Sequence, residues 1–252
     1  MVQDRNALKN AALVKGAQSG DLHAVQLLLA GANIQTDYKN ALTSAAIHGH
    51  VDVMQALLDK GANTHTCINN AIWYAAMSTS SNAEAIQLLL DAGADINLTV
   101  QNGYKHPITL LTYLSAWPKK LKEVQMLLEA GADVQAYENS ALQYASHVGN
   151  TEVVKMLLAA GADVLAGENR ALRYASRAGH TQVVQVLLAA GADVQARNNE
   201  ALVAASTNKH HAVVQMLLAA SKDSVNMNGY MWMLRCWWWR KWSGSHDRWG
   251  RS

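Results

Sequence analysis

The sequence predicts an all-α solenoid of about seven helix-turn-helix repeats, and two observations lead to this fold class. First, the triplet Gly-Ala-Asn or Gly-Ala-Asp recurs at spacings of 30 to 38 residues, followed by one degenerate copy. Second, the 252 residues include only two prolines and no phenylalanine, and half of them are apolar, with Ala and Leu prominent. Such a composition favours helix. The predicted repeats end near Gly31, Gly61, Gly93, Gly131, Gly161, Gly191 and Ser221.

The first helix of each repeat is predicted from apolar residues at helical spacing. In the unit that begins at Ser140, these residues are Ala141, Leu142, Ala145 and Val148. A small pair follows at one fixed position of nearly every unit, as Ala145-Ser146 in this one, and lets neighbouring helices approach closely. Gly149 is predicted to end this helix, because glycine adopts the left-handed conformation found at helix ends.

The second helix is predicted over residues 151–160, where Val153, Val154, Leu157 and Leu158 form one apolar stripe. Glu152 and Lys155 lie on the opposite, solvated side. A two-helix unit this short cannot bury its own apolar faces. The repeats are therefore expected to stack on one another and to build a continuous core.

The pattern Ala-Leu-x-Tyr-Ala-Ser-x-x-Gly-His-x-x-Val-Val-x-x-Leu-Leu-x-x-Gly-Ala-Asp-Val resembles the ankyrin repeat. The resemblance implies a solenoid with short β-turn or hairpin connections that binds another protein. The family's usual unit has about 33 residues and opens with Thr-Pro-Leu-His, whereas most units here are about three residues shorter and carry Ala in place of Pro. Only the fourth unit keeps a similar opening, at His106-Pro107-Ile108-Thr109. We expect the connections between repeats, which we call fingers, to be shortened at their tips. We also expect a concave face formed mostly by the first helices.

Three units depart from the regular spacing. The first lacks a residue before Gly31, and the third gains two around Ser78–Asn82. The fourth carries a longer hairpin and an insertion around residues 116–120. Insertions in solenoids map to loops, often on the binding side. The segment 98–120 is therefore the expected interruption of an otherwise uniform surface.

The chain is predicted to divide into a repeat domain, residues 1–223, and a tail, residues 224–252. The tail contains six of the eight tryptophans, and its five Lys and Arg residues against one Asp give it a charge of +4. Since the net charge is +2, the repeats carry −2, which provides no broad electrostatic surface for nucleic acid. Three interpretations of the tail remain open: an unselected extension, a cap on the last repeat, or a membrane or nucleic-acid contact.

No catalytic, cofactor-binding or metal-binding residue is predicted, and no small-molecule substrate. The sequence lacks the His-Glu-x-x-His, phosphate-loop and Gly-x-Ser-x-Gly motifs. His50 and His180 recur at the Gly-His turn, where a structural role explains them, and His210-His211 have no Cys, Asp or Glu at ligand spacing. Cys67 and Cys236 stand too far apart in sequence to indicate a disulfide framework.

The candidate binding residues lie at positions that vary between units or that repeat an aromatic side chain. Tyr74, Tyr144 and Tyr174 share one position, and either core packing or presentation to a partner explains them. Residues before the turn glycine and at the shortened finger differ from unit to unit without a packing reason. The complete set of partner-binding candidates is His48, Tyr74, Tyr137, Tyr144, His147, Tyr174, Arg177, Arg197 and Asn208.

These observations predict a monomeric adaptor, scaffold or targeting protein that binds another protein through its concave face. The alternative is an anchoring protein whose tail binds membrane or nucleic acid. An N-terminus without signal-peptide features and the lack of a long apolar run lead us to expect a cytoplasmic location. Short ankyrin units resemble those of large DNA viruses and intracellular bacteria, which would place the protein in a host cytoplasm.

Overall fold

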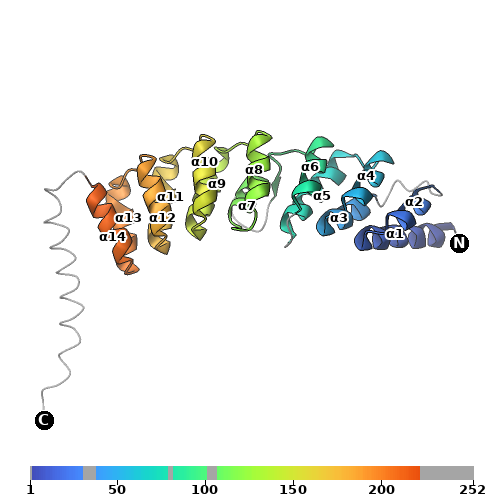
Figure 1. Cartoon of the computed structure of the whole chain (residues 1–252), viewed down its shortest axis with the longest axis horizontal. Helices are drawn as coiled ribbons and strands as arrows, with labels where there is room; N and C mark the ends of the chain where they lie inside the picture. Colours follow the sequence, from blue (N-terminus) through green and yellow to red (C-terminus); the bar gives the residue numbers. More distant parts are fainter. Residues whose placement is uncertain (1, 31–37, 79–81, 101–106, 222–252) are drawn as a thin grey trace, which may run out of the picture.

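A computed structural model describes residues 2–30, 38–78, 82–100 and 107–221, with side chains from residue 7 onward. Within these residues, fourteen helices stack in sequence order into an arched row, with α1 and α14 at opposite ends (Figure 1). The helices are α1 (Val2–Ser19), α2 (Leu22–Ala30), α3 (Tyr38–His48), α4 (Val51–Asp59), α5 (His65–Met77), α6 (Ala83–Asp91), α7 (Leu110–Ser115), α8 (Leu121–Glu129), α9 (Ala136–Val148), α10 (Thr151–Ala159), α11 (Ala166–Ala178), α12 (Thr181–Ala189), α13 (Ala196–Thr207) and α14 (His211–Ala220). This confirms the predicted fold class, with two helices in each of seven repeats.

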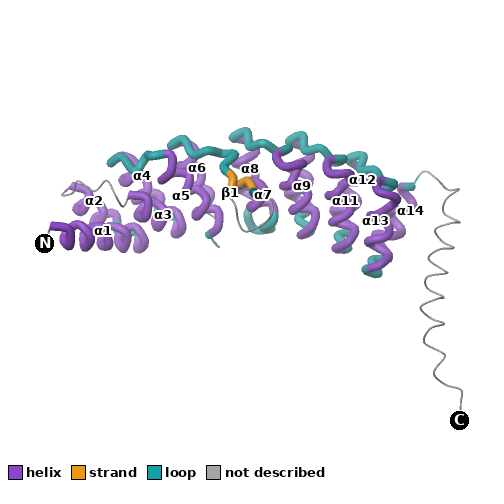
Figure 2. Tube along the Cα trace, turned by 180° about the vertical axis from the view of Figure 1, so that it is seen from behind, coloured by secondary structure: helices purple, strands orange, loops and turns teal. Residues whose placement is uncertain are grey.

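The helices form two layers. The odd-numbered helices are the first helices of the repeats, and they pack against one another along the row, as α9, α11 and α13 do in Figure 2. The even-numbered second helices form the other layer, and each also packs against the first helix of its own repeat. We call the surface formed by the exposed side chains of α3, α5, α7, α9, α11 and α13 the first-helix face.

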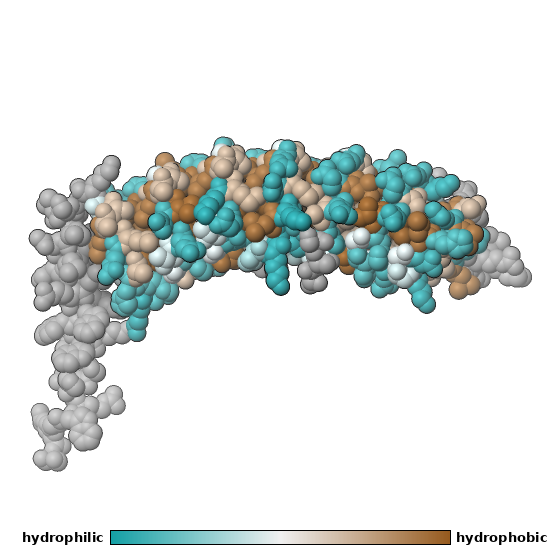
Figure 3. Space-filling model, viewed as in Figure 1, coloured by the Kyte–Doolittle hydropathy of each residue, from teal (hydrophilic) through white to brown (hydrophobic). Residues whose placement is uncertain are grey.

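The core lies between the two layers and runs the length of the row. In the fifth repeat, Leu142, Val153, Val154 and Leu157 are all buried, and Leu158 is partly buried, as the apolar stripe predicts. Hydrophilic residues project at intervals along the arch, with hydrophobic residues between them (Figure 3). Ala145 is fully buried where neighbouring first helices meet, which confirms the role of the small pair.

Gly149 ends α9 in the left-handed conformation with φ +80°, as predicted. A Cβ at this position would lie 2.6 Å from the Nδ1 atom of His180, so glycine is required by contact as well as by conformation. The turns after α10 and α12 are held differently. Asp163 accepts a hydrogen bond from the Leu165 backbone N–H at 2.9 Å, and the same bond joins Asp193 and Gln195.

The fourth repeat has the only strands in the described residues. β1 (Thr99–Val100) pairs antiparallel with β2 (Ile108–Thr109), with Thr99 opposite Thr109. Thr109 then caps the six-residue helix α7 by accepting a hydrogen bond from the Thr112 N–H at 3.1 Å. The longer hairpin predicted for this unit is confirmed, while its tip, residues 101–106, lies outside the described residues.

The shortened connections of the last three repeats are not hairpins, which the sequence did not predict. Tyr137, Glu138 and Asn139 form one left-handed turn, with φ between +51° and +60°, and the next two repeats do the same. A left-handed turn costs about 1–2 kcal/mol per residue other than glycine. The Asn139 side chain offsets part of this cost, since its Oδ1 accepts the Asp163 N–H at 2.8 Å.

The predicted tail, residues 224–252, lies outside the described residues, as does the irregular turn at Gly31. The interpretations of the tail as an extension, a cap or an anchor therefore stay predictions. The last described helix, α14, ends at Ala220, next to the degenerate Ser221 that the repeat spacing indicated.

Candidate functional site

The tyrosines that repeat along the solenoid belong to the first-helix face. Tyr74 on α5 and Tyr144 on α9 are 44% and 39% exposed, and Tyr174 on α11 is half-buried. Tyr74 and Tyr144 are thus more than half buried, as packing with the hydroxyl at the surface requires, and partly exposed, as presentation to a partner requires, so both interpretations stay open.

Tyr113 on α7 belongs to the same series, and the sequence analysis missed it. Its ring centroid lies 5.3 Å from that of Trp73 and 6.2 Å from that of Trp117. Burial raises the pKa of Tyr113, while a hydrogen bond with the Trp117 side chain opposes the shift. The longer fourth unit hides this tyrosine from a search at a spacing of 30 residues. Alignment from Leu114 and Ser115, which occupy the small-pair positions, would have found it.

Five of the nine candidate residues line one groove of about 840 Å³ on the first-helix face. These five are Tyr137, Tyr144, His147, Tyr174 and Arg177. The rest of the lining comes from the hairpin of the fourth repeat and from the fifth and sixth repeats: Pro107, Ile108, Glu138, Ser140, Gln143 and Arg170. The groove thus borders the segment 98–120, where the sequence predicted an interruption of the surface.

Two neighbouring helices supply four of the candidates that line the groove. Tyr144 and His147 stand three residues apart on α9, and Tyr174 and Arg177 occupy the equivalent positions on α11, so each pair shares one helix side. The His147 ring meets the Tyr174 ring edge-on, with centroids 5.6 Å apart. Such edge-to-face contacts contribute about 0.5–1.5 kcal/mol beyond area burial.

Histidines in the turns hold the backbone beneath this groove. The Nε2 atom of His180 bonds the His147 carbonyl oxygen at 3.0 Å, and that of His210 bonds the Arg177 carbonyl oxygen at 3.0 Å. His50 bonds Gln18 in the same way at 3.2 Å. This confirms the structural role predicted for His50 and His180. It also gives His210 that role, which sequence reasoning had not assigned.

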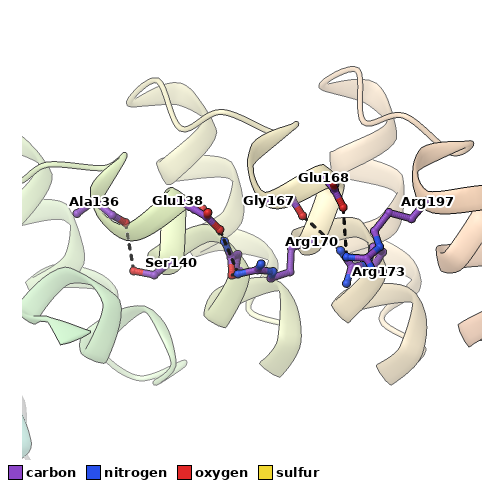
Figure 4. Close-up of polar contacts among 9 residues, drawn as sticks. Ala136, Glu138, Ser140, Gly167, Glu168, Arg170, Arg173 and Arg197 are labelled. Carbon is purple, nitrogen blue, oxygen red and sulfur yellow. Dashed lines mark hydrogen bonds and ion pairs between the residues drawn. The ribbon is translucent and has the colours of Figure 1, made fainter. Parts of the chain in front are cut away.

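Ion pairs line the finger side of the groove. Glu138 pairs with Arg170 at 3.3 Å, and Arg170 also donates to the Gln143 side chain at 3.4 Å (Figure 4). An equivalent ion pair joins the next two repeats, where Arg197 pairs with Glu168 at 3.2 Å (Figure 4). We call this series of ion pairs between neighbouring repeats the ladder. Arg197, a predicted binding residue, is therefore exposed but engaged in this ladder rather than in the groove.

The remaining candidates lie apart from the groove. His48 is exposed at the end of α3 and stacks on His50, with ring centroids 5.9 Å apart. Tyr74 lies two repeats before Tyr144 along the row. Asn208 is exposed at the end of α13, where its side chain donates to the Ala204 carbonyl oxygen at 2.8 Å. The structure thus places these residues on the surface but does not bring them together with the other five.

A buried ion pair stands in the fourth repeat at positions where the next repeat has no charged side chain. The side chains of Lys120 and Glu123 are 7% and 0% exposed, and Lys120 Nζ lies 3.3 Å from Glu123 Oε1. The equivalent residues of the next repeat are Asn150 and Val153. The sequence analysis did not single out this pair.

Other kinds of site were searched for among the described residues. No group of three or more His, Cys, Asp or Glu side chains is placed to hold a metal ion there. In the same part of the chain, every helix is too short or too polar to cross a bilayer.

Comparisons with known proteins match the fold. The family model for "Ankyrin repeats (3 copies)" matches residues 13–100 and 166–229, and the model for "Ankyrin repeat" matches residues 137–169. The first match ends six residues beyond the boundary predicted at 223. The crystal structure of the human ASB11 ankyrin repeat domain superposes with a TM-score of 0.67 at 26% identity, covering 83% of this chain and 97% of that one. No curated protein sequence matches significantly.

Proposed function

Since the chain belongs to the ankyrin-repeat family, whose members are generally protein-interaction modules, we propose that it is an adaptor, scaffold or targeting protein whose first-helix face binds a partner protein. The binding centre of this proposal is the groove between α9 and α11. Ankyrin repeats are in general non-catalytic scaffolds, and the proposal assigns no reaction to the protein. We further propose that the protein is monomeric, which light scattering tests, and cytoplasmic, which cell fractionation tests.

One observation carries the proposal: five of the nine candidates chosen because they vary or repeat without a packing reason line one groove. The groove contains three tyrosines and two arginines, and Tyr and Arg are among the residues most enriched at binding hot spots. The second helices contribute their apolar stripes to the core, so they present mostly polar side chains to solvent.

The rigidity of the site supports the same conclusion. The backbone at His147 and Arg177 is fixed by the turn histidines His180 and His210. A surface that is already ordered loses little conformational entropy when a partner binds. Several weak contacts on such an array can therefore add up to useful affinity.

The test is a parallel affinity capture with three forms of the full chain: wild type, a groove variant and a control. The groove variant changes Tyr144, His147 and Arg177 to Ala. A partner whose purified form binds the wild type should lose at least about 1 kcal/mol of binding free energy with this variant, measured by calorimetry.

The control variant changes three exposed residues of the opposite layer, Glu152, Lys155 and Gln182, to Ala. It should bind the partner as the wild type does, and both variants should keep the thermal unfolding midpoint within a few degrees. If the control variant lost binding and the groove variant did not, the proposed surface would lie on the wrong side of the solenoid.

A further inference from the structure

We propose that the groove binds an extended acidic segment of the partner, with an Asp or Glu carboxylate paired to Arg177. This inference rests on the proposed function and adds the chemistry of the partner to it. The unmatched charge of Arg177 and the aromatic walls around it are the two features from which we argue.

Arg177 is the one groove arginine without a carboxylate partner within the described residues. Arg170 pairs with Glu138, and outside the groove Arg173 pairs with Glu200 at 3.1 Å. The formal charges of the lining residues Arg170, Arg177 and Glu138 sum to +1. This positive site lies in a repeat domain whose total charge is −2.

Helix position alone does not explain Arg177. A cation in the last turn of a helix is favoured by the helix dipole. The equivalent residue of the seventh repeat, however, is Thr207, so the solenoid tolerates a neutral side chain there. Arg177 is exposed beside Tyr174, and its guanidinium has five N–H donors in a planar fork that suits a carboxylate.

Arg170 can act as a second, weaker donor. Its NH1 atom bonds Glu138 and Gln143 at 3.3 and 3.4 Å, and the guanidinium has more donors than these contacts use. A peptide that crosses from α11 toward the hairpin would therefore meet cationic groups from two positions of the sixth repeat.

The aromatic walls suit an extended chain with apolar side chains next to its acidic ones. Tyr144 and Tyr174 line the groove from α9 and α11, and Ile108 lines it from the hairpin of the fourth repeat. The volume of about 840 Å³ lies in the upper part of the ~300–1,000 Å³ range of pockets that enclose whole ligands. A groove of this volume has room for several side chains of a bound peptide rather than one.

The charge balance favours a carboxylate over a phosphate group. A phosphorylated residue carries about −1.5 to −2 charges at neutral pH and is usually bound by a cluster of arginines. A groove with a charge of +1 matches a single carboxylate. We therefore commit to an unmodified acidic segment.

The probe for the experiment comes from a phage-displayed library of random peptides, selected on the full-length chain. The most enriched peptide is synthesised in four forms: as selected, with its acidic residues changed to amides, with them changed to Lys, and with them changed to phosphoserine. Binding to the full-length protein is measured by fluorescence anisotropy. The tail carries a charge of +4 and could attract acidic peptides, so the assay needs a groove variant that leaves the tail unchanged.

That variant is Arg177→Glu, and its matched control is Lys122→Glu, an exposed cation on α8 in the opposite layer. We expect acidic peptides to be enriched, and the amide form to bind at least tenfold more weakly. Arg177→Glu should weaken the selected peptide at least tenfold and strengthen the Lys form, whereas Lys122→Glu should change both less than twofold.

Three outcomes would overturn the inference. Peptides that lose binding with Tyr144→Ala and Tyr174→Ala but not with Arg177→Glu would leave the proposed function standing and refute the acidic partner. Tighter binding of the phosphoserine form would assign the groove to a phosphorylated segment instead. Selected peptides that none of these groove changes weakens would refute both the inference and the proposed binding surface.

Discussion

Replacing Glu123 with Ala should destabilise the solenoid by about 3–5 kcal/mol, because it leaves the buried Lys120 without its carboxylate. The two side chains are 0% and 7% exposed and lie 3.3 Å apart, so water cannot take over the lost interaction at low cost. Exposed pairs behave differently. The pair between Lys155 and Glu152 has side chains that are 53% and 62% exposed, and such pairs contribute about 0–1 kcal/mol.

The chain itself supplies the variant that separates burial from pairing. Lys120→Asn combined with Glu123→Val installs the residues that the fifth repeat uses, Asn150 and Val153. Well-packed apolar residues in place of a buried ion pair are often neutral or stabilising by about 1–4 kcal/mol. Val meets that condition, and Asn150 shows how Asn is accommodated at this position, since its side chain donates to the Ser115 carbonyl oxygen at 3.5 Å. The double variant should therefore be at least as stable as the wild type, although each single variant loses stability.

The assay is urea unfolding followed by circular dichroism at equal protein concentrations. The midpoint should fall for Glu123→Ala and for Lys120→Asn alone, and recover or rise for the double variant. A loss below about 1 kcal/mol for Glu123→Ala would mean that the pair is hydrated and not buried. A double variant as unstable as the single ones would refute the idea that the fourth repeat can adopt the packing of its neighbour.

Three further predictions concern the solenoid. Leu157→Ala should lower the free energy of unfolding in urea by about 2–5 kcal/mol because Leu157 is fully buried, whereas Lys155→Ala on the solvated side should change it by no more than about 0.5 kcal/mol. Equal losses from both variants would mean that the buried face of this helix is wrongly assigned. Lys209→Gly should raise stability by up to about 1 kcal/mol, since Lys209 has φ +63° at a position where other repeats carry glycine; a lower thermal midpoint would contradict this. Residues 1–223 should unfold cooperatively without the tail, as monitored by helical circular dichroism, because each repeat contacts only its neighbours; a non-cooperative transition would instead assign a capping role to the tail.

Features that depend on the repeat period could be predicted from the sequence. The apolar stripe of residues 153–158 and the left-handed Gly149 follow from helical spacing and from glycine's conformational range, and the structure confirms both. The turn role of His180 was predicted for the same reason, because its position recurs with the fold.

Features that depend on packing between repeats could not be predicted. Nothing in the side chains of Tyr137 or Glu138 indicates a left-handed turn, which is imposed by the need to join two helices with fewer residues. The convergence of Tyr144, Tyr174 and Arg177 into one groove depends on how α9 and α11 lie side by side. Their positions in the sequence predict that these residues share one side of the solenoid. They do not predict that a groove forms there or that an ion pair borders it.

The bonds that cross from one repeat to the next make the repeats interchangeable. His180 and Asn150 stand at equivalent positions, each with a side chain that bonds a carbonyl oxygen of the preceding repeat: His147 for the former and Ser115 for the latter. Excision of residues 150–179 would join Gly149 to His180 and put the histidine where Asn150 had been, at the end of the fourth repeat's first helix. The shorter solenoid would keep its stacking rule but lose Tyr174 and Arg177. Core stacking and recognition are thus separable properties of this molecule, so gain or loss of a single unit could change its partner without rebuilding its core.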